Sequence, residues 1–115
     1  GSNYFENIIK SSAISNTYIA FEAGTTTTVN GLDIDGVSGS RSNIKSTISG
    51  TQFTITKSSG TVNTNYVTIK DSSATGGANW FSYTSNGNIN GGNNSGWMFA
   101  MVSNKPDSFF IFFDT

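Results

Sequence analysis

Apolar and polar side chains alternate along most of the chain, in short runs that end in clusters of glycine, asparagine and serine. The alternation is clearest in residues 32–35, 51–56 and 66–70. A period of two places successive side chains on opposite faces of a β-strand. No segment of ten or more residues has helical periodicity, so the pattern predicts an all-β domain.

The other strand-like runs are shorter or less regular. Residues 3–12 fit one helical turn or an irregular strand, and because no good helix former follows them, we interpret them as a strand or a docking arm. Asn30-Gly31 is a strong tight-turn signal. We expect Gly31, Gly36 and Gly77 at strand ends, with positive φ at one of them at least. The remaining candidate strands are residues 18–22, 25–29, 42–48, 80–83, 97–102 and 108–114.

Three pairs of apolar residues, at 32 and 34, 53 and 55, and 67 and 69, fit two arrangements of the strands. In the first, the pairs are equivalent inward positions on successive turns of a solenoid, although their unequal spacing makes the repeat weak. An antiparallel β-sandwich or jelly roll of about eight strands fits the same pattern. We expect the six residues of the pairs to be buried on one continuous apolar face: Leu32, Ile34, Phe53, Ile55, Val67 and Ile69.

Composition narrows the chemistry that the chain can perform. Its 115 residues have the size of one domain. It contains no cysteine and no histidine, which excludes disulfides, thiol nucleophiles, serine–histidine catalysis and histidine-bound zinc. The formal net charge is −1, without the basic stripe that a nucleic-acid binder usually needs. No apolar run approaches the roughly 18–20 residues that cross a bilayer, so we expect neither nucleic-acid binding nor membrane insertion.

The acidic residues suggest structural roles more than catalytic ones. Asp33 and Asp35 share one face of a strand, but calcium prefers six to eight oxygen ligands, so we interpret the pair as a solvated outer face. Asp71 precedes Ser72 and Ser73, yet no histidine is present to activate a serine. We interpret Asp71 as a turn residue whose side chain accepts hydrogen bonds from nearby backbone N–H groups. We therefore expect no catalytic residue, metal or cofactor.

Three aromatic residues are candidate ligand-binding groups: Trp80, Tyr83 and Trp97. Rings flanked by asparagine and glycine can stack on sugar faces while the amide groups bind hydroxyls. Alternatively, the two indoles bury apolar area at the ends of the fold, with their N–H groups satisfied locally. We favour this packing role for Trp80 and Trp97.

Residues 18–99 resemble a module of bacteriophage structural proteins and large bacterial surface proteins. The resemblance is carried by FEAGTTTTVNGLDIDG, by SGTQFTITKSSGTVNTNYVTIKDSSATGGANW and by GGNNSGWMF, of which DSSATGG and NNSGW are the most specific parts. Such modules resemble short right-handed parallel β-helices and commonly lie beside lectin-like or fibre domains. The resemblance favours the solenoid over the sandwich, and it implies no catalytic site.

The last residues depart from this module, which usually ends near the second tryptophan. We therefore divide the chain into an N-terminal arm, residues 1–17, a β domain, residues 18–102, and a C-terminal aromatic strand, residues 103–115. Because soluble monomers avoid large exposed apolar patches, a strand that is apolar on both faces predicts a homo-oligomer or a strand docked on a capsid partner. By analogy with the phage fibres and decoration proteins that the resemblance suggests, the oligomer is most plausibly a trimer. Phe109, Ile111 and Phe113 form one face of that strand, and Phe110 and Phe112 form the other.

These features predict a non-enzymatic structural protein of the bacteriophage virion, such as a capsid decoration protein or a tail fibre or spike module. Its partners would be its own copies, capsid proteins or tail proteins. The alternative is a carbohydrate-binding or adhesion module of a bacterial surface protein, on the cell surface or secreted, whose ligand would be a host surface glycan.

Overall fold

The computed structural model of the chain describes residues 2–11 and 18–100. The described residues form an all-β fold, as the alternation predicts, with one short 3-10 turn. The elements are β1 (Ser2–Ser11), β2 (Tyr18–Phe21), β3 (Thr26–Asp35), β4 (Ser42–Ser46), β5 (Phe53–Thr56), β6 (Thr61–Asn63), β7 (Val67–Ile69), β8 (Ser72–Thr75), β9 (Asn79–Phe81), η1 (Thr84–Asn86) and β10 (Ile89–Asn90).

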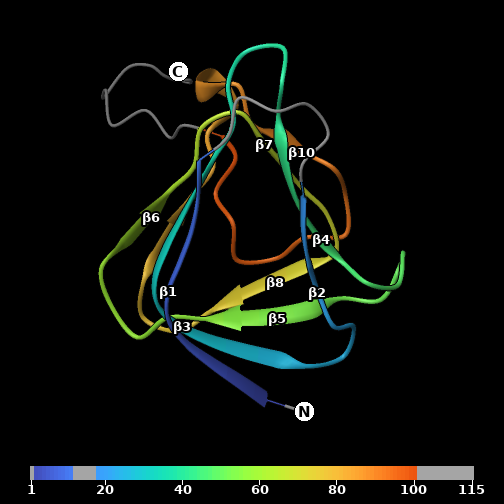
Figure 1. Cartoon of the computed structure of the whole chain (residues 1–115), viewed down its shortest axis with the longest axis vertical. Helices are drawn as coiled ribbons and strands as arrows, with labels where there is room; N and C mark the ends of the chain where they lie inside the picture. Colours follow the sequence, from blue (N-terminus) through green and yellow to red (C-terminus); the bar gives the residue numbers. More distant parts are fainter. Residues whose placement is uncertain (1, 12–17, 101–115) are drawn as a thin grey trace, which may run out of the picture.

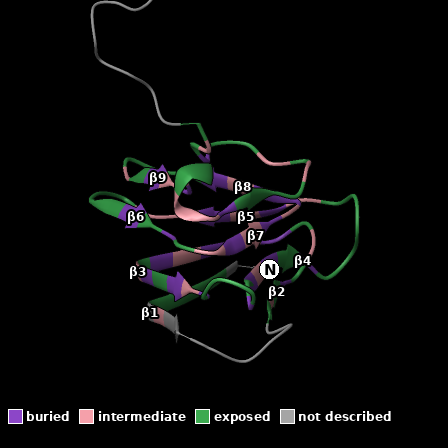
Figure 2. Ribbon diagram, turned by 90° about the horizontal axis from the view of Figure 1, so that it is seen from above, coloured by how far each residue is buried: buried purple, intermediate pink, exposed green. Residues whose placement is uncertain are grey.

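The strands form three sheets, with the orders β1-β3-β5-β8, β10-β7-β4-β2 and β6-β9. Every pairing between these strands is parallel. The antiparallel bridge in the described part of the chain joins Val37 to Ser40. The three sheets surround a common interior (Figure 1), and Figure 2 shows the strands at successive levels, from β1 and β2 up to β8 and β9.

Strand β3 belongs to two sides of the molecule at once. Thr26, Thr27 and Thr28 pair with β5, whereas Asp35 at the end of the strand pairs with Asn65, which follows β6. Strand β1 pairs with β3 along nearly its whole length. The segment that we interpret as a strand or an arm is therefore a strand of the first sheet.

The core is a cluster of aliphatic and aromatic side chains that all three sheets contribute. All six residues predicted to be buried are buried, and Phe53, Ile55, Val67 and Ile69 are fully inaccessible. Phe21 stacks on Phe53 with 4.6 Å between ring centroids. Because parallel strands in register bring inward positions side by side, each level of the core packs on the next.

The predicted equivalence of the three apolar pairs is wrong, although their burial is right. Ile55 of β5 lies between Thr27 of β3 and Ala74 of β8. Ile69 of β7 pairs with Ile44 of β4, in a different sheet. The pairs at 53–55 and 67–69 therefore face the core from two different sheets. They are not repeats of one position, which explains why the three pairs are unequally spaced.

The turn expected at Asn30-Gly31 is also absent, because β3 runs straight through it. Gly31 pairs with Asn7 of β1, and the Asn30 side-chain amide donates to the Glu6 carboxylate at 2.8 Å. This long pairing outweighs the local preference for a turn.

None of the glycines Gly31, Gly36 and Gly77 has positive φ, contrary to expectation. Gly36 and Gly77 are needed instead for close approach between segments. A Cβ atom at Gly36 would overlap the Tyr66 carbonyl oxygen, and one at Gly77 would overlap the Ser58 carbonyl oxygen. Any side chain at these two positions would push neighbouring levels apart.

The core predicts a large penalty for truncating Phe53. Phe53→Ala should lower the free energy of unfolding by about 3–5 kcal/mol, because it removes a fully buried ring and leaves a cavity. Thr54→Ala is the matched control, since Thr54 is half-buried on the same strand. Urea titration measures both. Equal midpoints for Phe53→Ala and the wild type would contradict this assignment of the core.

Candidate functional site

Both tryptophans are part of the core. Trp80 and Trp97 are 4% and 8% exposed and meet edge to face, with 5.0 Å between ring centroids. The Trp80 indole N–H donates to the Thr75 carbonyl at 3.2 Å, and that of Trp97 donates to the Ser72 hydroxyl at 2.9 Å. This geometry fits the packing role, and neither ring has an exposed face for a sugar.

The Tyr83 ring packs on a different aromatic residue from the two indoles. Its ring stacks on Phe81, with 5.2 Å between centroids and 16° between planes, and both residues are half-buried. The Tyr83 hydroxyl lies 3.9 Å from the Met98 sulfur. Sequence reasoning did not include Phe81, although its spacing of two from Tyr83 places both rings on one side of an extended segment.

The two acidic residues of β3 differ in their surroundings. Asp33 is exposed, whereas Asp35 is half-buried and accepts hydrogen bonds from the Asn65 backbone N–H at 3.0 Å and its side-chain amide at 3.3 Å. Burial raises the pKa of Asp35, and a hydrogen bond with Asp33 adds to the effect. Among the described residues, no group of three or more acidic side chains could hold a metal ion.

Asp71 is the most deeply buried charge in the described structure. It has positive φ, 58°, and is only 1% exposed. One carboxylate oxygen accepts from the Gly50 backbone N–H at 3.1 Å and from the Lys70 ammonium at 2.9 Å, and the other accepts from the Asn93 amide at 2.8 Å. The Lys70 and Asn93 hydrogen bonds lower the pKa of Asp71, against the opposing effect of burial. The prediction for Asp71 is right in one part and wrong in the other: its positive φ suits a turn, but its backbone donor, Gly50, is distant in sequence and not a neighbour.

A polar hollow of about 360 Å³ adjoins Asp71. Its two cations already have partners. Lys70 binds Asp71 and donates to the Ser49 hydroxyl at 2.8 Å, and the Lys45 ammonium lies 4.2 Å from the centroid of the Tyr18 ring. The hollow therefore presents no uncommitted charge to an anion.

Asn88 forms a buried polar network that no local sequence pattern predicts. Its amide donates to the carbonyls of Thr64 and Tyr83, both at 2.8 Å. Its side-chain oxygen accepts from the Val67 backbone N–H and from the Thr64 hydroxyl, both at 3.0 Å. Ser82 lies 2.8 Å from that hydroxyl. Asn88 thus ties the chain between β9 and β10 to the segment between β6 and β7.

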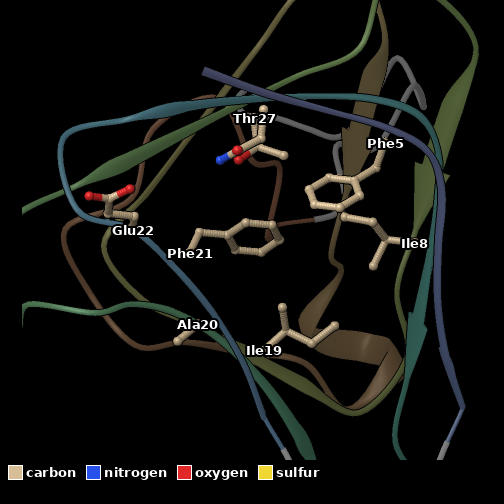
Figure 3. Close-up of a pocket in the computed structure, with 8 residues that line it drawn as sticks. Phe5, Ile8, Ile19, Ala20, Phe21, Glu22 and Thr27 are labelled. Atoms are coloured by element: carbon tan, nitrogen blue, oxygen red, sulfur yellow. The ribbon is translucent and has the colours of Figure 1, made fainter. Parts of the chain in front are cut away.

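An apolar pocket of about 290 Å³ lies at the β1–β2 end of the molecule and is the strongest candidate for a binding site. We call it the end pocket (Figure 3). Phe5, Ile8, Ile19 and Phe21 supply its apolar side chains. Its full lining is Asn3, Phe5, Ile8, Ile19, Ala20, Phe21, Glu22 and Thr27.

Strands β1 and β2 carry three exposed aromatic side chains, of which Phe5 lines the end pocket, whereas Tyr4 and Tyr18 lie on the outer faces of the two strands. Tyr4 is 63% exposed, Phe5 46% and Tyr18 58%. Sequence reasoning missed the pocket because it treated residues 1–17 as an arm. The available signal was the density of apolar residues in 4–9 and 18–21, which exceeds what two edge strands can cover by themselves.

The predicted oligomer or docking residues, Phe109, Phe110, Ile111, Phe112 and Phe113, lie outside the described residues. No protein-family model matches the chain, and no curated protein or solved structure is significantly similar to it. In the described part of the chain, no helix has the length and apolar character required to span a membrane.

The Asp71 network predicts a stability loss that depends on pH. Asp71→Ala should cost about 2 kcal/mol, because it removes the charged acceptor of two part-buried hydrogen bonds, from Gly50 and Asn93. Asp71→Asn is the control, since asparagine also tolerates positive φ and keeps one acceptor. It should cost less than Asp71→Ala.

The pH dependence follows from the lowered pKa of Asp71. The stabilisation is complete above the unfolded-state pKa of about 3.9 and is lost as the pH falls through the lower folded-state pKa. The stability gap between wild type and Asp71→Ala should therefore narrow below about pH 4. Thermal unfolding at pH 7 and pH 3 measures the gap, and an unchanged gap would contradict the assignment.

The Asn88 network predicts that the fold is destabilised when the Asn88 side chain is removed. Asn88→Ala should destabilise the fold by about 3 kcal/mol or more, because it orphans buried groups of Val67, Thr64 and Tyr83. Asn90→Ala is the control, since Asn90 is exposed on β10. Hydrogen exchange should show faster exchange of the Val67 amide in Asn88→Ala alone.

Proposed function

We propose that this chain is a non-enzymatic structural module of a bacteriophage particle, a capsid decoration protein or part of a tail fibre or spike, that acts by protein–protein binding. The observation that carries the proposal is the end pocket. A small all-β body with a buried core presents one apolar pocket that the half-exposed Phe5 lines, on two strands that also carry the exposed Tyr4 and Tyr18. Exposed apolar patches of this kind mark interaction sites.

The proposal includes a finer description of the fold, a short right-handed parallel β-helix-like solenoid. Successive passages of the chain place β3, then β4, then β5, β6 and β7, then β8, β9 and β10 on three sides of the core. Parallel strands joined by crossover connections favour right-handed connections. The resemblance of residues 18–99 to phage and surface-protein modules points to the same fold.

The polar groups that could carry chemistry have structural partners, which favours binding over catalysis. Asp71 is held by Lys70, Gly50 and Asn93, and Asp35 is held by Asn65. The Asn88 amide makes hydrogen bonds through both its nitrogen and its oxygen. These groups fix the shape of a rigid scaffold on which exposed side chains are displayed.

Carbohydrate binding by a bacterial adhesion module is the second candidate, favoured by the Phe81–Tyr83 stack. The two rings are half-buried, and Asn86 and Thr84 follow Tyr83 in the same loop. Aromatic faces and amide groups together suit a sugar. This candidate no longer uses Trp80 or Trp97, since both are buried.

Particle association tests the leading proposal. Phage particles from the bacterial host that carries the gene should contain the chain after density-gradient banding, and gold-labelled antibodies should decorate their heads or tails. A chain recovered only in the soluble fraction would contradict the proposal.

A glycan array tests the alternative with the same protein. Binding to host polysaccharide that Tyr83→Ala abolishes and Tyr18→Ala preserves would favour the adhesion module. Tyr18 is the control because it is an exposed tyrosine outside the Phe81–Tyr83 stack.

A further inference from the structure

The two ends of the strand stack are closed to different degrees. At the β8–β9 end, Ser95 pairs with Ser73, Met98 pairs with Phe81, and the buried Trp97 packs on Trp80. The chain thus covers that end with its own residues. At the opposite end, β1 and β2 are the outermost strands of their sheets, and the end pocket lies between them.

Strand β1 therefore offers both a backbone edge and a hydrophobic surface. Within the described residues, β1 pairs with β3 on one side and with no strand on the other. Phe5, which pairs with the buried Val29, lines the pocket, and Tyr4 lies on the outer face. A strand added beside β1 would complete its hydrogen bonds and meet apolar side chains on both faces.

We propose that the end pocket of one copy binds the C-terminal aromatic strand, residues 108–114, of a second copy by strand addition to β1. This inference rests on the proposed function and names the surface that binds the partner. Of the two faces of that strand, Phe109, Ile111 and Phe113 enter the pocket. Phe110 and Phe112 lie on the outer face, beside Tyr4.

The size of the pocket fits this occupant. A cavity of about 150 Å³ holds one benzene ring. The end pocket has a volume of about 290 Å³ and is open to solvent on one side, so about two of the three side chains fill it and the third covers its open side. Alternate side chains of an added strand enter such a site while its backbone pairs with the sheet edge.

Distance favours a neighbouring copy over the molecule's own tail. A strand beside β1 lies about five strand spacings from the level of Ser95, or about 24 Å. Residues 101–107 join Ala100 to residue 108 over eight Cα–Cα steps, which span at most about 29 Å when fully extended. A tail that folds back on its own molecule would need a linker close to its full extension, a restriction that does not apply to the pocket of a neighbouring copy.

The contact joins two different surfaces, so it is head to tail. Such heterologous contacts form rings when the rotation closes and filaments when it does not. A closed ring would bury every aromatic strand and every end pocket. A trimer, the predicted assembly, satisfies this condition.

Subunit mixing tests the proposal with full-length chains. Phe5→Asp places a charge in the pocket, and Ile111→Asp places one in the tail. Ile89→Asp is the control, because Ile89 is 41% exposed on β10, away from the pocket, and Phe5 is 46% exposed. Light scattering gives the molar mass of each variant and of a mixture of the pocket and tail variants, and circular dichroism confirms that each is folded.

The wild type and Ile89→Asp should be oligomers, and each of the other variants alone should have the mass of one 12.2 kDa chain. The mixture should form a one-to-one heterodimer, because one intact pocket meets one intact tail. If Phe5→Asp does not fold, Phe5→Ser takes its place.

Four results would overturn the proposal: a monomeric wild type, an oligomeric Phe5→Asp, a mixture that stays monomeric, or an Ile89→Asp variant that is monomeric. A monomeric wild type in which Ile111→Asp alters the fluorescence of Tyr4 and Tyr18 would assign the pocket to the molecule's own tail. Particle association is measured separately, so a chain that binds particles but fails these mixtures contradicts the docking and leaves the proposed function standing.

Discussion

Parallel pairing in register is the constraint on which the rest of the structure depends. It places the inward side chains of neighbouring strands side by side. In one sheet Thr27, Ile55 and Ala74 form an inward row, and in another Ile44 and Ile69 do so. A side chain in such a row has fixed neighbours above and below. The size of the side chain at each strand can therefore be adjusted to fill the interior. Thr27 and Ala74 are small, whereas Phe53 and Ile55 on the strand between them are large.

The same constraint determines where buried polar groups are useful. Turns at the corners of neighbouring levels lie close together, and their backbone groups need partners from another level. Asp71 accepts from Gly50 and Asn93, and Asn88 bridges Thr64 and Val67. These side chains hydrogen-bond neighbouring turns to one another outside the strands, where no sheet pairing connects them. The lowered pKa of Asp71 records how fully its charge is compensated in spite of burial.

Period-two alternation was sufficient to predict an all-β fold and the burial of six core residues, because burial on a strand depends on local pattern. It was insufficient for partners. The chain passages differ in length, so Leu32-x-Ile34 and Phe53-x-Ile55 looked equivalent although they occupy different places in the sheets. Asn30-Gly31 predicted a turn that pairing with β1 overrides. The Asn88 network depends on contacts between distant residues, which no local signal in this sequence contains, and the apolar density of residues 4–9 and 18–21 does not say that the two strands meet at one pocket.

A stack of parallel strands has two ends, and each end exposes a core and a row of unpaired backbone groups. Proteins avoid uncontrolled pairing at such edges by covering or closing them. In this molecule the indoles of Trp80 and Trp97 and the bridges of Ser95 and Met98 close one end. At the other end, β1 and β2 are the outermost of the described strands, and Phe5 is 46% exposed. Within the described residues the two ends therefore differ, and the proposed head-to-tail contact rests on this difference, because it joins two unlike surfaces.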